Sequence, residues 1–216
     1  MTAVKIAAAT LVIAAFGLSI ALYGALPALL PTHWNAAGEV DNQSPKMIAA
    51  FIMPGMMVVI AALFASFPLI SPRGFELDPS GRAYRAILLA VLTFMLALHV
   101  FMLVSAMRGF RYSPFAMPTL IGALLVIIGA FLPELPRNFF IGIRTPWTLA
   151  DQEVWKRTHR FGGPLFVICG ALLVTLGPFL RQQASTMAMM GFVLFSALAT
   201  VIYSFVIYRW PNTGFR

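Results

Sequence analysis

Two polar segments of this 216-residue chain hold most of the side chains that could do chemistry. In the first, at 27–46, His33, Asn35 and Asp41 offer an imidazole, an amide and a carboxylate. Together they could bind a polar group or, weakly, a metal ion. They could equally brace their own loop, because Asn and Asp side chains commonly hydrogen-bond nearby backbone groups.

The second segment, at 134–162, is rich in Arg, Trp and Thr. Arg144 and Arg160 could grip a phosphate or carboxylate with paired N–H donors. Alternatively, the Trp and Arg side chains anchor the segment at a membrane surface. Thr148 and Asp151 resemble a capping box, which predicts a short interfacial helix from about 149 to 160. Because no recognisable catalytic, metal-binding or P-loop sequence is present, we predict no catalytic residue, metal or cofactor.

The elements that must position these segments are long stretches without charge. A helix of roughly 20 apolar residues crosses the hydrocarbon core of a bilayer. The sequence therefore predicts an all-α, polytopic membrane helix bundle that forms a single membrane domain, 1–216. Its first part, 5–46, contains the first span and the outer motif, and its last part, 134–208, contains the inner motif and two spans. The six predicted spans lie near 6–26, 47–70, 86–107, 116–133, 163–180 and 187–208.

Composition supports this class. Hydrophobic residues make up 60% of the chain and charged residues 10%, which excludes a soluble globular domain and a disordered chain. The net charge of +8 does not indicate nucleic-acid binding, because the cations are spread over several loops. The single Cys169 lies in a predicted span and suits an apolar filling role.

The distribution of Lys and Arg predicts the orientation. With the N-terminus inside, eleven of the 15 cations fall on the inner side, so the positive-inside rule places both termini in the cytoplasm. The segment 27–46 is then outside and the segment 134–162 inside. His33 and His159 would lie on opposite faces and could not share one site.

Glycines recur every seven residues in three predicted spans, at Gly17 and Gly24, Gly122 and Gly129, and Gly163, Gly170 and Gly177. Because small residues let membrane helices approach closely, we expect these three spans to form the tightest part of the bundle. A shift of 105 residues also lays the first span and its Leu-Pro exit on the fourth. This suggests a 3+3 inverted pseudo-repeat, with the alternative that Pro simply ends both helices.

His99 is the ionisable side chain predicted within a span, and it could be an intramembrane polar site. It could hydrogen-bond a neighbouring helix as a neutral ring, or it could line a cavity. Because no acidic residue falls at the central depth of a span, a proton- or sodium-coupled carrier is disfavoured.

Both polar segments resemble signature sequences of the SdpI family, bacterial membrane proteins named for immunity to a sporulation-delaying toxin peptide. The outer segment resembles the family's N-terminal module, and the inner one its longer signature, while Pro164 departs from the family pattern. The candidate ligand- or partner-binding residues are His33, Trp34, Asn35, Gly38 and Asp41 outside, and Arg137, Asn138, Arg144, Thr145, Trp147, Trp155, His159 and Arg160 inside.

The resemblance implies a non-enzymatic protein of the bacterial cytoplasmic membrane that protects its host from a secreted, membrane-active toxin peptide. It also implies a receptor role, in which a cytoplasmic repressor is held at the membrane. Partners would be membrane lipid, the toxin peptide and this repressor, with no direct contact to nucleic acid. Two alternatives stay open: a small-molecule or lipid transporter built on the inverted repeat, and a membrane enzyme acting on lipid or peptide.

Overall fold

The computed structural model describes residues 2–35, 37, 39–109 and 116–211. Within these ranges, six helices are long and apolar enough to cross a membrane, as the sequence predicts. They are α1 (Thr2–Leu22), α2 (Lys46–Ile70), α3 (Arg82–Met107), α4 (Ala116–Phe131), α6 (Gln152–Leu176) and α7 (Gln182–Arg209). Short elements are η1 (Tyr23–Ala25), β1 (Leu29–Trp34), β2 (Val40–Pro45), η2 (Leu132–Glu134), α5 (Pro146–Ala150) and η3 (Gly177–Phe179).

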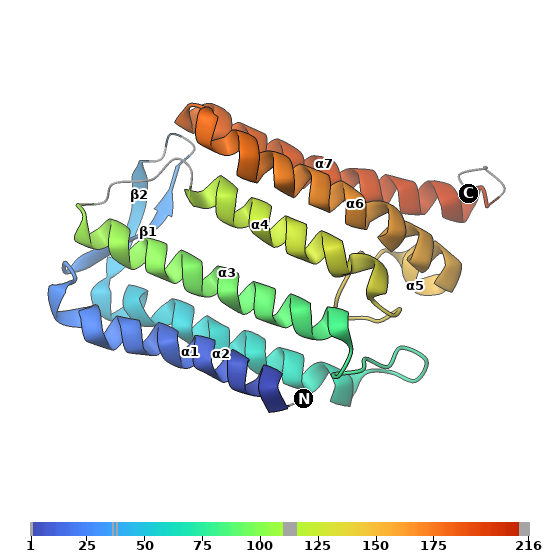
Figure 1. The fold of residues 1–216 in the computed structure, drawn as a ribbon, viewed down its shortest axis with the longest axis horizontal. Helices are drawn as coiled ribbons and strands as arrows, with labels where there is room; N and C mark the ends of the chain where they lie inside the picture. Colours follow the sequence, from blue (N-terminus) through green and yellow to red (C-terminus); the bar gives the residue numbers. More distant parts are fainter. Residues whose placement is uncertain (1, 36, 38, 110–115, 212–216) are drawn as a thin grey trace.

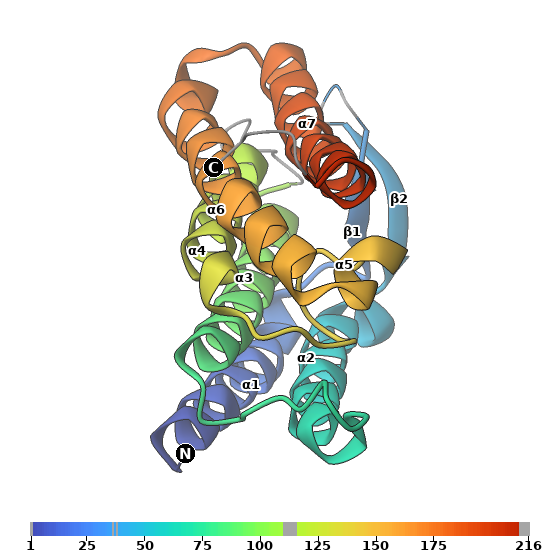
Figure 2. The ribbon, with the colours of Figure 1, turned by 90° about the vertical axis from the view of Figure 1, so that its right-hand side faces the viewer.

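The long helices lie side by side as two groups of three, α1 to α3 and α4, α6 and α7, with α3 packed against α4 (Figure 1). The hairpin β1–β2 lies at one end of the bundle. The short helix α5, the start of α1 and the end of α7 lie at the other end (Figures 1 and 2). The two motif segments are therefore at opposite ends of the molecule. The inverted relation between the two groups stays a prediction.

Glycines bring α4 and α6 into direct backbone contact, as expected from their spacing. A Cβ atom added at Gly129 would lie 2.6 Å from the carbonyl oxygen of Gly163, and one at Gly122 would lie 2.7 Å from that of Gly170. Neither distance is tolerable for a real Cβ atom, so these positions require glycine. This pair of helices makes the most extensive contact in the bundle.

The same prediction is wrong for the first span. A Cβ atom at Gly17 or Gly24 would meet nothing within 4 Å. What ties α1 to its neighbours is instead a polar contact: the hydroxyl of Ser19 donates to the carbonyl of Ala50 in α2 (2.5 Å) and lies 2.9 Å from Nε2 of His99 in α3.

Two prolines inside α2 explain where such contacts form. Proline has no N–H, so Pro54 and Pro68 each leave the carbonyl four residues earlier without its helical bond. Those carbonyls belong to Ala50 and Phe64. Ala50 accepts from the hydroxyl of Ser19, and Phe64 accepts from the hydroxyl of Tyr84 in α3. Each carbonyl that a proline frees in α2 is thus satisfied by a hydroxyl from a neighbouring helix.

The inner segment differs from its prediction. No separate helix runs from 149 to 160, because α6 already begins at Gln152 and continues without a break through Gly162, Gly163 and Pro164. The capping box is formed by Thr145 and Thr148 at the start of α5 rather than by Thr148 and Asp151. Asp151 instead caps α6, where its carboxylate accepts from the backbone N–H groups of Glu153 and Val154 (2.7 and 2.9 Å).

Candidate functional site

The outer motif folds as an antiparallel hairpin that stands on the ends of α2 and α3. Its strands pair from Leu29 with Pro45 to Trp34 with Val40, and the pairing is irregular around His33. Leu30 is completely buried in a cluster with apolar residues of α2 and α3, such as Ala49 and Leu103. The hairpin is therefore fixed to the bundle by its strand β1.

The polar residues of this motif brace the loop. The side-chain oxygen of Asn35 accepts from the backbone N–H groups of Ala37 and Glu39, and its amide donates to the Glu39 carboxylate (3.0 Å). Nδ1 of His33 lies 2.5 Å from the carboxylate of Asp41 across the two strands. Both side chains of this pair remain exposed, at 65% and 43%. The bracing interpretation thus holds for Asn35, and the His33–Asp41 pair is open to the surroundings.

Trp34 and Gly38 are the two remaining candidate residues of the outer motif. The Trp34 ring packs against Phe101 of α3, with 5.4 Å between ring centroids. Gly38 lies outside the described residues. Among the residues that are described, no three His, Cys, Asp or Glu side chains gather as they would around a metal ion.

Beneath this motif is a pocket of about 490 Å³ between the hairpin and the bundle. One wall consists of residues 31–35, and the others come from α2, α3, α4 and α7. The hairpin and the start of α7 lie at the same end of the bundle (Figure 1). Five methionines line the pocket, alongside the rings of Trp34 and Phe101: Met53, Met102, Met117, Met189 and Met190. Methionine side chains are flexible and polarisable, so such a wall adapts to apolar ligands of varied shape.

These methionines were missed by the sequence reasoning. A signal was present, because Met187, Met189 and Met190 crowd the start of the last span. Without the hairpin, however, nothing in the sequence assigns Met189 and Met190 to the same pocket as His33. The hairpin itself was not predicted beyond an extended exit from the first span.

At the other end of the bundle, Asn138 organises the inner loop. It is completely buried. Its amide donates to the carbonyls of Pro136 and Ile141, and its oxygen accepts from the N–H groups of Phe140 and Ile141, all between 2.7 and 3.0 Å. The hydrogen-bonding capacity of this side chain is used within the loop, so it positions the segment.

Thr145 and Trp147 join the short helix α5 to α7. The hydroxyl of Thr145 lies 3.4 Å from that of Ser204, and the Trp147 indole N–H donates to the same Ser204 oxygen. Thr148 donates to the carbonyl of Ile143 (2.9 Å). These contacts attach the inner motif to the end of the last span.

Trp155 and His159 form the buried centre of the inner motif. Their rings stack with 4.0 Å between centroids, and the Trp155 indole donates to the carbonyl of Leu135 (2.9 Å). Nε2 of His159 accepts from the backbone N–H of Ile143 (3.0 Å), so its proton sits on Nδ1, which donates to the carbonyl of Trp155 (2.8 Å). His159 is therefore a neutral structural ring with both nitrogens engaged.

Gly142 makes this centre possible. Its φ of +111° is a conformation that residues with a side chain rarely adopt, and an added Cβ atom would lie 2.5 Å from Nε2 of His159. The loop can therefore approach His159 only with glycine at this position.

Of the candidate arginines of the inner motif, Arg144 and Arg160 are exposed and Arg137 is half-buried. Arg137 donates to the carbonyls at the end of α5 (3.3 and 3.4 Å) and lies over the ring of Phe75. Arg144 is exposed and donates to the carbonyl of Phe139 (2.6 Å), and Arg160 is exposed on α6. Among the described residues, no hydrogen bond or ion pair joins Arg144 to Arg160, so their shared grip on one anion stays a prediction.

His99 takes the first of its two predicted roles. Its ring is completely buried, and because the Ser19 hydroxyl donates to Ala50, Nε2 of His99 donates to Ser19. His99 lines neither the outer pocket nor the cavity between α1 and α2 described below.

Each of the two motif segments matches a known protein family or domain. Residues 134–204 match the SdpI/YfhL protein family, and residues 10–58 match a domain of unknown function (DUF1648). The Immunity protein SdpI of Bacillus subtilis (strain 168) is 25% identical to this chain over 197 residues, which cover 90% of each protein. The resemblance to the SdpI family is confirmed. No solved structure matches the chain.

The SdpI/YfhL match comprises the inner loop, α5, α6 and most of α7, and thus the whole buried centre around Trp155 and His159. The second match comprises most of α1, the outer hairpin and the first half of α2. Each match therefore carries one of the two motif segments.

Proposed function

We propose that this protein is a non-enzymatic immunity protein of the bacterial cytoplasmic membrane, and that it binds a membrane-active toxin peptide in the outer pocket. The name of its Bacillus subtilis relative, an immunity protein, supports the first part of the proposal. The Met-lined pocket beneath the hairpin supports the second.

The chemistry of the pocket carries the proposal. A peptide that acts on membranes must present apolar side chains, and the walls of this pocket offer methionines and two aromatic rings for them. Polar groups stand at the rim, where His33 pairs with Asp41 and Asn35 holds the loop tip. An apolar interior with a polar rim is the arrangement found at specific peptide-binding sites.

The proposal assigns the inner motif to a cytoplasmic partner. In the proposed orientation, both termini and the exposed Arg144 and Arg160 face the cytoplasm, where a repressor protein could dock. Trp147 links this motif to α7, and α7 also lines the outer pocket through Met189 and Met190. A peptide in the pocket would thus touch the helix to which the inner motif is attached.

Survival of a sensitive host tests the proposal. We expect expression of this chain in Bacillus subtilis lacking SdpI to permit growth in the presence of the sporulation-delaying toxin peptide. Met190→Gln should lower the protective capacity by roughly tenfold, because Met190 is 55% exposed in the free protein and its burial against the peptide is worth about 1.5–3 kcal/mol. Met187→Gln is the matched control, since Met187 lies on the same helix and does not line the pocket.

Equal protein levels in the membrane must be verified for all variants. Failure of the wild-type chain to protect would contradict the immunity proposal for this peptide. Protection that is equally sensitive to Met187→Gln and Met190→Gln would contradict the pocket. Labelling of single cysteines introduced at His33 and at Arg144, with a reagent that does not cross membranes, tests the orientation.

Among the described residues, the observations bear differently on the two alternatives. The transporter hypothesis calls for a cavity with His99 in its wall, and His99 is buried against Ser19. The enzyme hypothesis calls for a convergent acid, base or nucleophile. Both nitrogens of His159 are engaged by the backbone, whereas His33 and Asp41 do meet on the exposed hairpin.

A further inference from the structure

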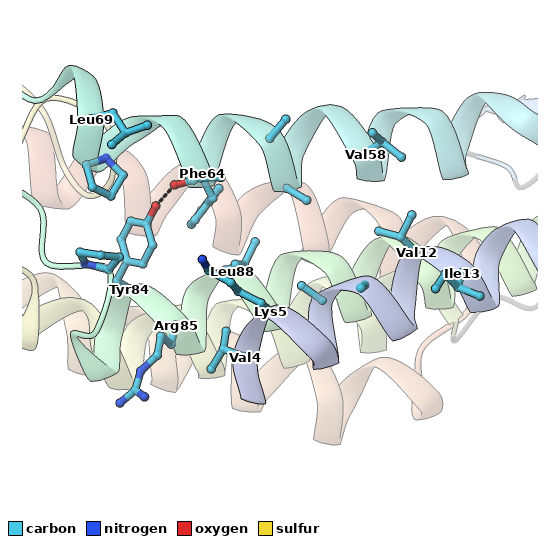
Figure 3. A pocket seen from close by; sticks show the side chains of 17 residues that line it. Val4, Lys5, Val12, Ile13, Val58, Phe64, Leu69, Tyr84, Arg85 and Leu88 are labelled. Carbon is cyan, nitrogen blue, oxygen red and sulfur yellow. Dashed lines mark hydrogen bonds between the residues drawn. The ribbon is translucent and has the colours of Figure 1, made fainter. Parts of the chain in front are cut away.

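A second cavity, of about 680 Å³, lies between α1, α2 and the beginning of α3 (Figure 3). It is at the end of the bundle that carries the N-terminus, opposite the outer pocket. Apolar residues make up most of its wall, and Lys5 and Arg85 are the only charged residues among the 17 that line it. This cavity is separate from the proposed toxin site.

Small side chains leave this space open. Ala8, Ala61 and Ala65 face it from α1 and α2. In membranes such residues usually let two helices close on each other. Here the helices stay apart, and the hydroxyl contact between Tyr84 and Phe64 holds α2 to α3 on one side of the cavity. If this space were empty, the side chains of its wall would lose van der Waals contacts. We therefore expect another molecule to occupy it.

The open side of the cavity faces the hydrocarbon region. Ile13, Val58 and Leu69 lie at its edges and are 69%, 46% and 85% exposed. In a membrane the neighbouring medium is lipid, so the molecule with direct access is a lipid acyl chain.

The charges of the wall select the headgroup. Lys5 extends from α1 toward Tyr84, over the space between the helices, and Arg85 extends from the start of α3 away from α2 (Figure 3). None of the 17 residues of the wall is acidic, so the Lys5 charge lacks an acidic partner within it. The carboxylate of Asp78, outside the wall, interacts with Arg85, but the hydroxyl and backbone N–H of Ser80 donate to it and make the larger contribution to lowering its pKa.

From these observations we propose that the cavity between α1 and α2 binds one acyl chain of an anionic phospholipid, with the lipid phosphate beside Lys5 and within the field of Arg85. The apolar wall would hold the acyl chain, and the two cations would favour an anionic headgroup over a neutral one. Basic pockets between membrane helices are suited to anionic headgroups for the same reason.

Lipid binding to the purified full-length chain tests this proposal. Phosphatidylglycerol and phosphatidylcholine with identical acyl chains are titrated separately, and bound lipid is counted by native mass spectrometry. Each cation near an anionic headgroup raises the affinity about fivefold. Phosphatidylglycerol should therefore bind at least about fivefold tighter than phosphatidylcholine. Lys5→Gln should remove most of that preference and leave phosphatidylcholine binding unchanged, while Arg85→Gln should have the smaller effect.

Two further variants separate a built site from general attraction. Ala61→Phe together with Ala65→Phe should fill the slot and abolish tight binding of both lipids without loss of folding, because the new rings enter open space. Arg209→Gln is the control, since the exposed Arg209 ends α7 at the same end of the bundle and lies outside the cavity. Equal affinity of the wild type for both lipids, a preference that survives Lys5→Gln, or binding that survives the filled slot would each overturn the proposal. None of these results depends on toxin protection.

Discussion

The carbonyl of Phe64 offers a direct measurement of how the first three helices hold together. Pro68 denies this carbonyl its helical N–H, and the hydroxyl of Tyr84 takes that place. Tyr84→Phe removes only the hydroxyl and leaves a buried carbonyl without a partner. Such a group costs about 1–3 kcal/mol, and hydrogen bonds between membrane helices average about 0.6 kcal/mol, so we expect a loss of about 1–2 kcal/mol.

A double-mutant cycle makes the reasoning specific. Pro68→Ala restores an N–H at position 68, so the Phe64 carbonyl regains its helical bond. In that background Tyr84→Phe should cost less than about 0.5 kcal/mol, which gives a coupling of about 1 kcal/mol between positions 68 and 84. The free energy of unfolding is measured for all four proteins by titration with sodium dodecyl sulfate in mixed micelles.

Tyr203→Phe is the control for loss of a tyrosine hydroxyl. The Tyr203 ring stacks on Phe161, and within the described residues its hydroxyl takes part in no hydrogen bond, so we expect a change below about 0.5 kcal/mol. If Tyr84→Phe cost the same with proline and with alanine at position 68, the hydroxyl would not be replacing the lost helical bond, and the interpretation of α2 would be refuted.

Three further predictions use the same unfolding assay. Gly129→Ala should destabilise the fold by about 1–3 kcal/mol because its Cβ atom meets the Gly163 carbonyl, whereas Gly17→Ala, with open space around it, should cause no loss. Gly142→Ala should cost more than about 2 kcal/mol through its φ of +111° and the contact with His159, and a result near zero would contradict that geometry. Asn138→Ala should cost about 2 kcal/mol or more, since four backbone groups lose the fully buried side chain as their partner; retained stability would show that water replaces the side chain.

The spans could be predicted closely because a single physical rule sets them. Lipid requires a helix to be long, apolar and internally hydrogen-bonded, so uncharged runs alone located six helices to within a few residues at most ends. The pairing of Gly122 and Gly129 with α6 followed from the same environment, in which small residues permit backbone contact. Gly17 shows the limit of that inference, because spacing cannot tell a packed glycine from one that faces lipid.

The errors arose where a residue type has two uses. The short helix expected at about 149–160 and the span expected from 163 are one continuous helix, α6. In the structure, Gly163 faces Gly129, and a Cβ atom at Gly162 would meet Ile143 and Thr200 at 2.8 Å, so these glycines serve close approach within a continuous helix. The hairpin and the Met-lined pocket depend on contacts between segments far apart in sequence, which no local pattern contains.

The glycine contacts between α4 and α6 restrict how this molecule can change shape. Because carbonyl oxygens rest where side chains would otherwise stand, and the Cβ atoms of Phe166 and Leu125 lie close beside Gly129 and Gly170, the two helices cannot slide along each other without a clash. These two helices must travel as one rigid body. Any motion that relays an event from the hairpin end to the α5 end is therefore confined to hinges around that body, along the α3 boundary or at α7.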